Sequence, residues 1–395
     1  MCFVKQSTIK TFKSSLKKEE GMKKKIITVL FTVAAIIACF GFSACGLFGG
    51  NNGDNGSGGG SKPEFAAGTG TETDPYKISQ GYQWLNVGKH PDSFFELTAD
   101  INLGDYKTVA PTGTAESPFE GTIEGNNHKI TGAKVSSDHN AGLFGVLSGA
   151  TVKNLGFTSS GVHMESKSDN DVMGSFAAIA RKGTIIENCF SQSVSLNFTK
   201  YSTKYVMIGG FVGSVESVSA VSYCHSDVNI KAPDGSRFYI GGFARLVSGS
   251  MIDCCYTEGT ISVWGPSGKN VCRIGTFVDR VINSDVTNMY AEMSVNAKGA
   301  TGVYYFAGNV DEETLKFCLN FCDYQQAVDG RYEVCGVEYN GSQYVNIYFP
   351  SSEYAYANDT LDKSLWCDNP VWKKGRVHPE FVSYEEYLQI KSAGN

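Results

Sequence analysis

The chain has 395 residues, with 34 Lys and Arg against 40 Asp and Glu, 45 Gly and 12 Cys, and 42% of it is hydrophobic. This composition is typical of a globular protein and excludes a collagen-like or broadly disordered chain. Residues 1–44 hold eight Lys and two Glu, so the remaining 351 residues carry 26 basic and 38 acidic side chains, a net charge of −12. An acidic body disfavours nucleic acid as a partner, because binding phosphate requires an excess of Lys and Arg.

The first predicted element is an export signal. Three Lys precede an apolar run over residues 26–41, and Ser43, Ala44 and Cys45 follow. This order is typical of a charged n-region, an apolar h-region and a small-residue cleavage site. The segment resembles a bacterial lipoprotein signal peptide, which implies cleavage after residue 44 and lipidation of Cys45. We therefore predict a signal peptide over residues 22–44.

The flanks of this segment complete the predicted leader. We interpret residues 1–21 as a mis-annotated upstream extension, because a clean n-region begins at Met22. The alternative to lipidation is an uncleaved membrane anchor over residues 26–48. Residues 45–66 are rich in Gly, Asn and Ser and predict a flexible linker. The sequence thus predicts an exported protein at the cell surface, whose membrane contact is an N-terminal lipid.

An internal repeat dominates the rest of the chain. A Gly-x-Phe element recurs with spacings of 32, 35, 32 and 34 residues at Phe144, Phe176, Phe211, Phe243 and Phe277. After each element come a second short motif and alternating apolar residues, and alternation with period two predicts strands. Units this small cannot bury their own apolar face, so they must stack.

The stack that fits best is an all-β, right-handed parallel β-helix, in which equivalent residues of successive turns lie about 4.8 Å apart. We predict this solenoid over residues 67–323, with a cap at its N-terminal end and a C-terminal capping region over residues 324–395. Solenoids require such caps because their end turns expose apolar surface. A short helix is predicted over residues 385–391.

The repeat motifs carry a family resemblance. The segments Gly142-Leu143-Phe144-Gly145 and 209–213 (GGFVG) resemble the GLUG-motif repeats of bacterial surface proteins. Three preceding segments, at residues 70–78, 95–103 and 119–130, are similar to the region before such repeats. The resemblance implies a cell-surface, often adhesin-like β-helix and fixes no activity.

Cysteines follow the repeat. Cys189, Cys224 and Cys255 share one repeat position with Leu155 and Met289, which predicts an interior column of reduced thiols. The alternative is a metal site built on the Cys318-x-x-x-Cys322 spacing. That spacing lacks paired Cys-x-x-Cys motifs, so we predict neither a metal nor a cofactor.

The residue after each of these positions is predicted to face outward. These residues are Phe190, His225, Tyr256 and Tyr290, and two residues further on lie Gln192, Asp227, Glu258 and Glu292. Aromatic rings beside carboxylates suit sugar binding, and neighbouring carboxylates suit a retaining glycosidase. The alternative, which we favour, is a solvated acidic stripe beside a packed aromatic stack.

Three loops that close the turns are basic although the chain is acidic. They predict a ligand-binding set made of Tyr201, Lys204, Arg237, Tyr239, Trp264, Lys269 and Arg273. Loops at one phase of a solenoid lie on one side, and local positive charge steers anionic ligands. The alternative is that these side chains merely cover the edges of the turns.

These patterns favour binding over catalysis, and no catalytic residue is predicted. The first hypothesis is a non-catalytic, adhesin-like lipoprotein that binds a glycan or another host or environmental polymer. A polysaccharide lyase or glycosidase on the same scaffold is the second. The third is a structural envelope protein with a protein partner.

Overall fold

The computed structural model divides the chain into two units, residues 1–61 and 62–395. The structure describes residues 62–200, 205–232, 237–264, 272–298, 303–304, 307–310, 315–321, 344–347, 372–374 and 379–393. The Cys45 lipidation site, the signal peptide and most of the linker therefore lie outside the described residues. No helix in the described ranges is long and apolar enough to cross a membrane.

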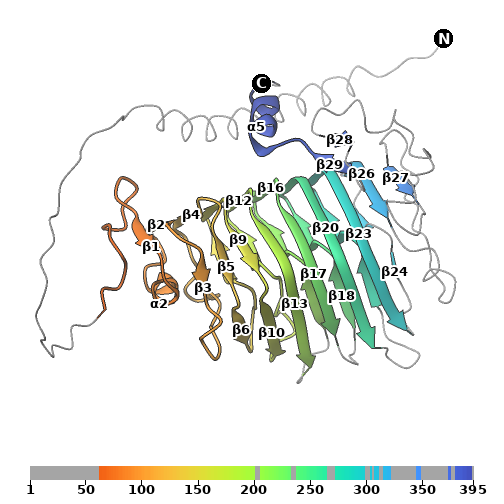
Figure 1. The fold of residues 1–395 in the computed structure, drawn as a ribbon. Helices are drawn as coiled ribbons and strands as arrows, with labels where there is room; N and C mark the ends of the chain where they lie inside the picture. The colour runs from red at the N-terminus through yellow and green to blue at the C-terminus, as the bar shows by residue number, and fades with distance from the viewer. Residues whose placement is uncertain are drawn as a thin grey trace, which may run out of the picture. The chain divides into compact units, whose positions relative to one another are not determined.

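The second unit is a parallel β-helix, as the repeat predicts (Figure 1). Successive turns of the chain pair in parallel register, for example Ile186 with Val152 on one side and with Val221 on the other. The fold class is thus confirmed, while the right-handed sense stays a prediction.

The largest sheet has 17 strands, arranged as ladders in which each turn adds one strand to the next. Its first ladder consists of β1 (Tyr76–Ile78), β2 (Phe94–Leu97), β4 (Thr122–Glu124), β8 (Thr151–Lys153), β12 (Ile185–Glu187), β16 (Ala220–Ser222), β20 (Met251–Trp264), β23 (Asp285–Lys298), β26 (Leu315–Phe321) and β27 (Tyr344–Ile347). A second ladder consists of β3 (Ile101–Asn102), β5 (Lys129–Thr131), β9 (Gly156–Thr158), β13 (Phe190–Lys200) and β17 (His225–Ala232). A third ladder, made of β6 (Lys134–Ser137) and β10 (Gly161–Ser166), joins the second at β13. The separate strands of early turns merge into the 14-residue strands β20 and β23.

Two smaller parallel sheets complete the later turns. A six-stranded sheet contains β7 (Phe144–Ser148), β11 (Ala177–Arg181), β15 (Val212–Glu216), β19 (Ala244–Ser248), β22 (Val278–Ile282) and β25 (Ala307–Val310). A four-stranded sheet contains β14 (Val206–Gly209), β18 (Phe238–Gly241), β21 (Cys272–Gly275) and β24 (Val303–Tyr304). The last three Gly-x-Phe elements, which end at Phe211, Phe243 and Phe277, are the turns that connect these two sheets.

Short helices and an antiparallel pair flank the stack. The α2 helix (Gly81–Trp84) lies at the N-terminal end of the stack (Figure 1) and is followed by the 3-10 helix η1 (Val87–Lys89). The two helices bury Trp84 and Val87 in the core. At the other end of the chain, β28 (Trp372–Lys374) pairs with β29 (Pro379–Phe381), and α5 (Tyr384–Ala393) follows. A C-terminal helix is thus present where the sequence predicts one.

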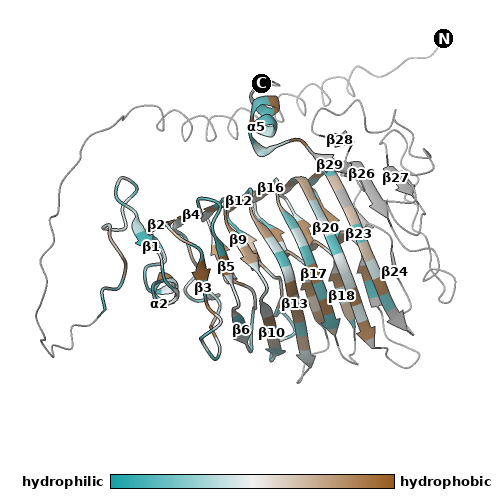
Figure 2. Ribbon diagram, in the orientation of Figure 1, coloured by the Kyte–Doolittle hydropathy of each residue, from teal (hydrophilic) through white to brown (hydrophobic). Residues whose placement is uncertain are grey.

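The core is built from columns of equivalent residues. The Phe residues of the Gly-x-Phe turns are fully buried and stack on one another, with ring centroids 4.9 to 5.5 Å apart from Phe144 to Phe277. Hydropathy alternates along β13, β17 and β20 (Figure 2), because successive side chains of a strand point to opposite faces. The interior position of each strand therefore carries the apolar residue.

The cysteine column is interior, as predicted. Cys189, Cys224 and Cys255 are each at most 1% exposed and are free thiols. Burial raises the pKa of all three thiols, so they remain protonated and pack as small apolar groups.

Candidate functional site

Two columns of outward-facing side chains meet where the four-stranded and six-stranded sheets join. On the first sheet Tyr239 of β18 is in register with Arg273 of β21. On the second, Arg245 of β19 lies beside Asp279 of β22, since the residues that precede them, Ala244 and Val278, are paired. We call Tyr239, Arg245, Arg273 and Asp279 the Tyr–Arg corner.

Earlier turns fill the same corner with small and apolar side chains. The equivalents of Arg245 and Asp279 are Gly145, Ala178 and Gly213, by the register of β7, β11, β15 and β19. An ideal Cβ on Gly213 would lie 2.3 Å from Cγ1 of Val172, so no larger side chain fits there without movement. The charged corner is therefore particular to the later turns.

Asp279 holds the corner together. Its carboxylate is 0% exposed and accepts hydrogen bonds from Arg273, through Nε to Oδ1 and through Nη2 to Oδ2 at 2.9 Å. The Nε of Arg245 lies 3.8 Å from Oδ2. A two-point contact between guanidinium and carboxylate fixes both groups in one plane.

Tyr239 provides a ring surface for the arginines. The guanidinium carbons of Arg273 and Arg245 lie 4.8 and 5.8 Å from its ring centroid, distances typical of cation–π contacts. The ring of Tyr205 lies 5.8 Å away, and the exposed Arg237 donates from Nη1 to the Tyr205 hydroxyl at 3.4 Å. Tyr205 and Arg237 thus extend the corner toward the loops.

Positive charge exceeds negative charge in this region. Arg237, Arg245 and Arg273 against Asp279 give three positive charges and one negative, a net charge of +2. The nearby Arg280 and Glu216 add one charge of each sign. The side chains of Arg245 and Arg273 are 17% and 19% exposed, so each retains some contact with solvent.

Burial perturbs the charged groups. It raises the pKa of Asp279, and the hydrogen bonds from Arg273 partly offset that rise. Burial also lowers the pKa of the Arg245 guanidinium, and its Nε has no hydrogen-bond partner. This Nε is itself buried, so its lack of a partner adds a cost to the corner and does not offer a donor to solvent.

The predicted binding set is partly brought together. Tyr239 and Arg273 are in direct contact, and Arg237 joins them through Tyr205. Trp264 ends β20, and its side chain is not among those described; Tyr201, Lys204 and Lys269 lie outside the described residues.

Sequence reasoning missed Arg245 and Asp279 as site residues. The available signal was the position two residues after Phe176, Phe211, Phe243 and Phe277, which is Ala178 and Gly213 and then becomes Arg245 and Asp279.

The outward aromatic column is a stack whose ring faces cover one another. The rings of Phe190, His225 and Tyr256 are stacked and nearly parallel, with interplanar angles of 2° and 1° and centroids 5.0 and 4.7 Å apart. The Phe190 ring also lies over Gly156, where an added Cβ would come within 2.5 Å of it. Burial lowers the pKa of His225 to about 4, so it is neutral at pH 7. Sugar stacking requires a free ring face, so this column is better explained as packing.

One predicted member of the acidic stripe is misplaced. Asp227, Glu258 and Glu292 are in register on adjacent turns. A bulge in β13 between Ser191 and Val194 removes Gln192 from this register, and the backbone N–H of Ser193 donates to Asp227 instead. The sequence pattern did not reveal this bulge.

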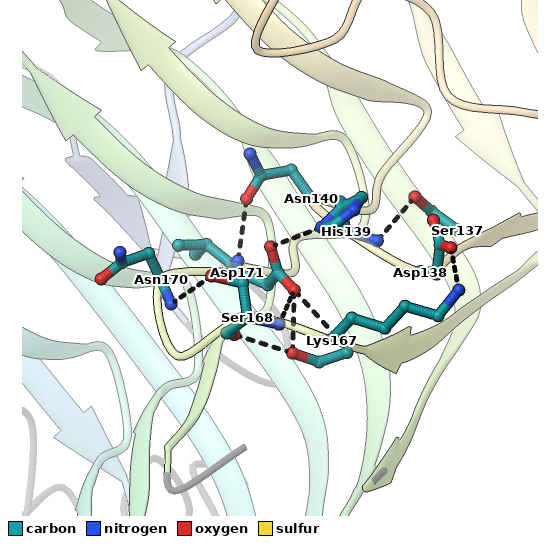
Figure 3. Close-up of polar contacts among 10 residues, drawn as sticks. Ser137, Asp138, His139, Asn140, Lys167, Ser168, Asn170 and Asp171 are labelled. Atoms are coloured by element: carbon teal, nitrogen blue, oxygen red, sulfur yellow. Dashed lines mark hydrogen bonds and ion pairs between the residues drawn. The ribbon is translucent and has the colours of Figure 1, made fainter. Parts of the chain in front are cut away.

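The loops of the first turns form an acidic clamp rather than a basic surface (Figure 3). Asp171 is 6% exposed; its Oδ2 accepts hydrogen bonds from the Ser166 hydroxyl and two backbone N–H groups, and Nδ1 of His139 lies 3.2 Å from its Oδ1. Lys167 pairs with Asp138 across the two loops. These contacts hold the two loops to each other.

Comparisons with known protein sequences give one partial match. No protein-family model matches the chain. A curated protein of Evansella cellulosilytica, described as a "Putative Gly-rich membrane protein", is 35% identical over 111 residues. The match covers 26% of this chain and 13% of that protein, so the chain spans a small part of this relative's length.

Two solved structures are similar. The crystal structure of a "putative immunoglobulin A1 protease" from Bacteroides ovatus has a TM-score of 0.55 at 18% identity, covering 80% of this chain and 95% of that one. A second, "IgA1 Protease", has a TM-score of 0.45 at 16% identity, covering 69% of this chain and 21% of that one. At this identity, the first likeness shows a shared β-helix scaffold.

Proposed function

We propose that the chain is a surface lipoprotein, anchored through Cys45, whose β-helix binds an anionic polymer such as an acidic polysaccharide at the Tyr–Arg corner. The observation that carries this proposal is a cluster with a net positive charge, in which Arg245 and Arg273 lie beside the buried Asp279 carboxylate and over the Tyr239 ring, and Tyr205 and Arg237 continue the cluster. Guanidinium groups bind carboxylate, sulfate and phosphate oxygens well, and tyrosine rings suit the apolar faces of sugars.

Location at the cell surface is supported by the leader and the repeats. The predicted signal peptide ends at a Cys, and the Gly-x-Phe repeats resemble the GLUG motifs of bacterial surface proteins. The name of the Evansella protein places that relative at a membrane. An adhesin-like role follows from an outward binding site on a lipid-anchored scaffold.

The test uses residues 61–395, which contain the whole second unit, and a panel of anionic and neutral polysaccharides. We expect retention on anionic polymers, weakening as salt rises, without retention on neutral ones and without released sugars. Release of oligosaccharides would instead identify a lyase or glycosidase. Equal retention on neutral polymers would contradict a site built on arginine.

A further inference from the structure

The helix α5 lies against the side of the stack, over a corner that departs from the pattern of the other turns. At this corner each turn places one residue in the left-handed backbone conformation, with φ between 51° and 57° at Asn154, Asn188, Tyr223, Cys254 and Asn288. Asn is the side chain that best tolerates this conformation, and Asn188 donates to Asn154 at 2.6 Å along the column. Tyr and Cys gain nothing from the backbone here, which points to another reason for their presence.

That reason is contact with α5. The Tyr223 ring lies 5.1 Å from both Tyr384 and Tyr387, and its hydroxyl donates to the carbonyl of Val382. Cys254 is 0% exposed, whereas the equivalent Asn188 and Tyr223 are partly exposed. The helix therefore packs on Tyr223, the first position where the asparagine column is interrupted, and contacts Asp253 next to Cys254, the second.

A buried carboxylate of the stack contacts two side chains of the helix. Asp253 is 1% exposed, and its Oδ1 accepts hydrogen bonds from Thr287 and Asn288 at 2.8 and 2.7 Å. Its Oδ2 accepts from the Tyr387 hydroxyl at 3.3 Å and pairs with Lys391. Tyr387 and Lys391 are four residues apart and so share one face of the helix.

The orientation of Asp253 does not depend on α5. Thr287 and Asn288, which orient Asp253, belong to β23 of the stack. Of the α5 side chains, Tyr387 is the buried one, and the main core cluster contains no α5 residue. The solenoid thus has a complete core without the helix.

We infer that Tyr223, Asp253 and Cys254 form a recognition seat for the chain's own C-terminal helix, which docks as a separable latch through Tyr387 and Lys391. The seat would accept an amphipathic segment with a tyrosine and a lysine one helical turn apart. This inference does not depend on the anion site.

Alkylation of Cys254 in the full chain tests the latch, with the labelled cysteine identified by mass spectrometry. We expect slow labelling in the wild type and labelling faster by about tenfold or more in Lys391→Ala, because a charged contact to a buried carboxylate is lost. Gln389→Ala, on the exposed face of α5, is the matched control and should label like the wild type. Cys224 and Cys255 should stay unlabelled in all variants, which shows that the stack remains closed.

A second arm separates docking from folding. A chain ending at residue 381 should label quickly at Cys254, and a peptide of residues 382–395 added in trans should slow it again. A peptide carrying Lys391→Ala should protect less. Unchanged labelling in Lys391→Ala, equal labelling of Cys224, no protection by the peptide, or a wild-type rate that depends on protein concentration would each overturn the inference.

Discussion

Replacing Phe211 with Ala is expected to lower the free energy of unfolding by about 3–5 kcal/mol, the range for truncating a fully buried phenylalanine. Phe211 is in the middle of the interior ring column, with Phe176 and Phe243 at 4.9 and 5.1 Å. It is 0% exposed, so truncation removes ring contacts on both sides and leaves a cavity. Denaturant unfolding of residues 61–395 measures the loss as a shift of the midpoint.

A matched variant separates cavity formation from loss of a solvated ring. Phe190→Ala removes a ring from the outward column, which is partly exposed and rests on Gly156. Its cost should be well below that of Phe211→Ala. Equal losses for the two variants would contradict the assignment of the Gly-x-Phe column to the core.

Arg273→Ala is expected to destabilise the protein by about 3–5 kcal/mol at pH 7, because it leaves the buried Asp279 carboxylate without its two-point partner. The loss should shrink as the pH is lowered toward 4. Burial already raises the pKa of Asp279 above its usual 3.8, and removal of Arg273 takes away the main effect that opposes the rise. Urea unfolding at several pH values measures both effects.

The sign follows from proton binding. Between the unfolded pKa near 3.8 and the raised folded pKa, the folded variant binds more protons than the unfolded chain, so its stability increases as the pH falls through that window. The control is the double variant Arg273→Ala with Asp279→Ala, since Ala178 already occupies the equivalent position in an earlier turn. It should be more stable than Arg273→Ala at pH 7; a double variant that is less stable would contradict the role of the unpaired carboxylate.

The sequence predicts the repeat well because period and burial coincide. Phe144 to Phe277 recur with the turn, and Cys189, Cys224 and Cys255 are interior because a strand that alternates must place them opposite Phe190, His225 and Tyr256. Which residues pair on adjacent turns of one sheet can be predicted by counting residues along the repeat. The bulge at Ser193 breaks such counting, and nothing in the local composition announces it.

The sites depend on relations that counting along a turn cannot supply. Arg245 and Arg273 belong to different sheets, and they meet because the turn after Gly241 brings two outward columns to face each other. The seat of α5 joins Tyr223 to Val382, 159 residues apart, and Asp253 to Tyr387, 134 residues apart. Contacts between residues so far apart in the sequence depend on tertiary packing. The sequence does give one signal for them, because Tyr223 and Cys254 interrupt a column of asparagines.

The most direct test of the anion site is the affinity of residues 61–395 for an acidic polysaccharide, compared between the wild type and Arg245→Ala. Arg245 is suited to this test because Ala178 occupies the same position in an earlier turn, and Asp279 keeps its contact with Arg273. Lys134→Ala, an exposed change of equal charge far from the corner, is the control. We expect affinity to fall by about tenfold in Arg245→Ala, the loss of one charge-assisted hydrogen bond, with an unchanged unfolding midpoint and little effect of Lys134→Ala. Equal affinity in all three proteins would contradict binding at the Tyr–Arg corner.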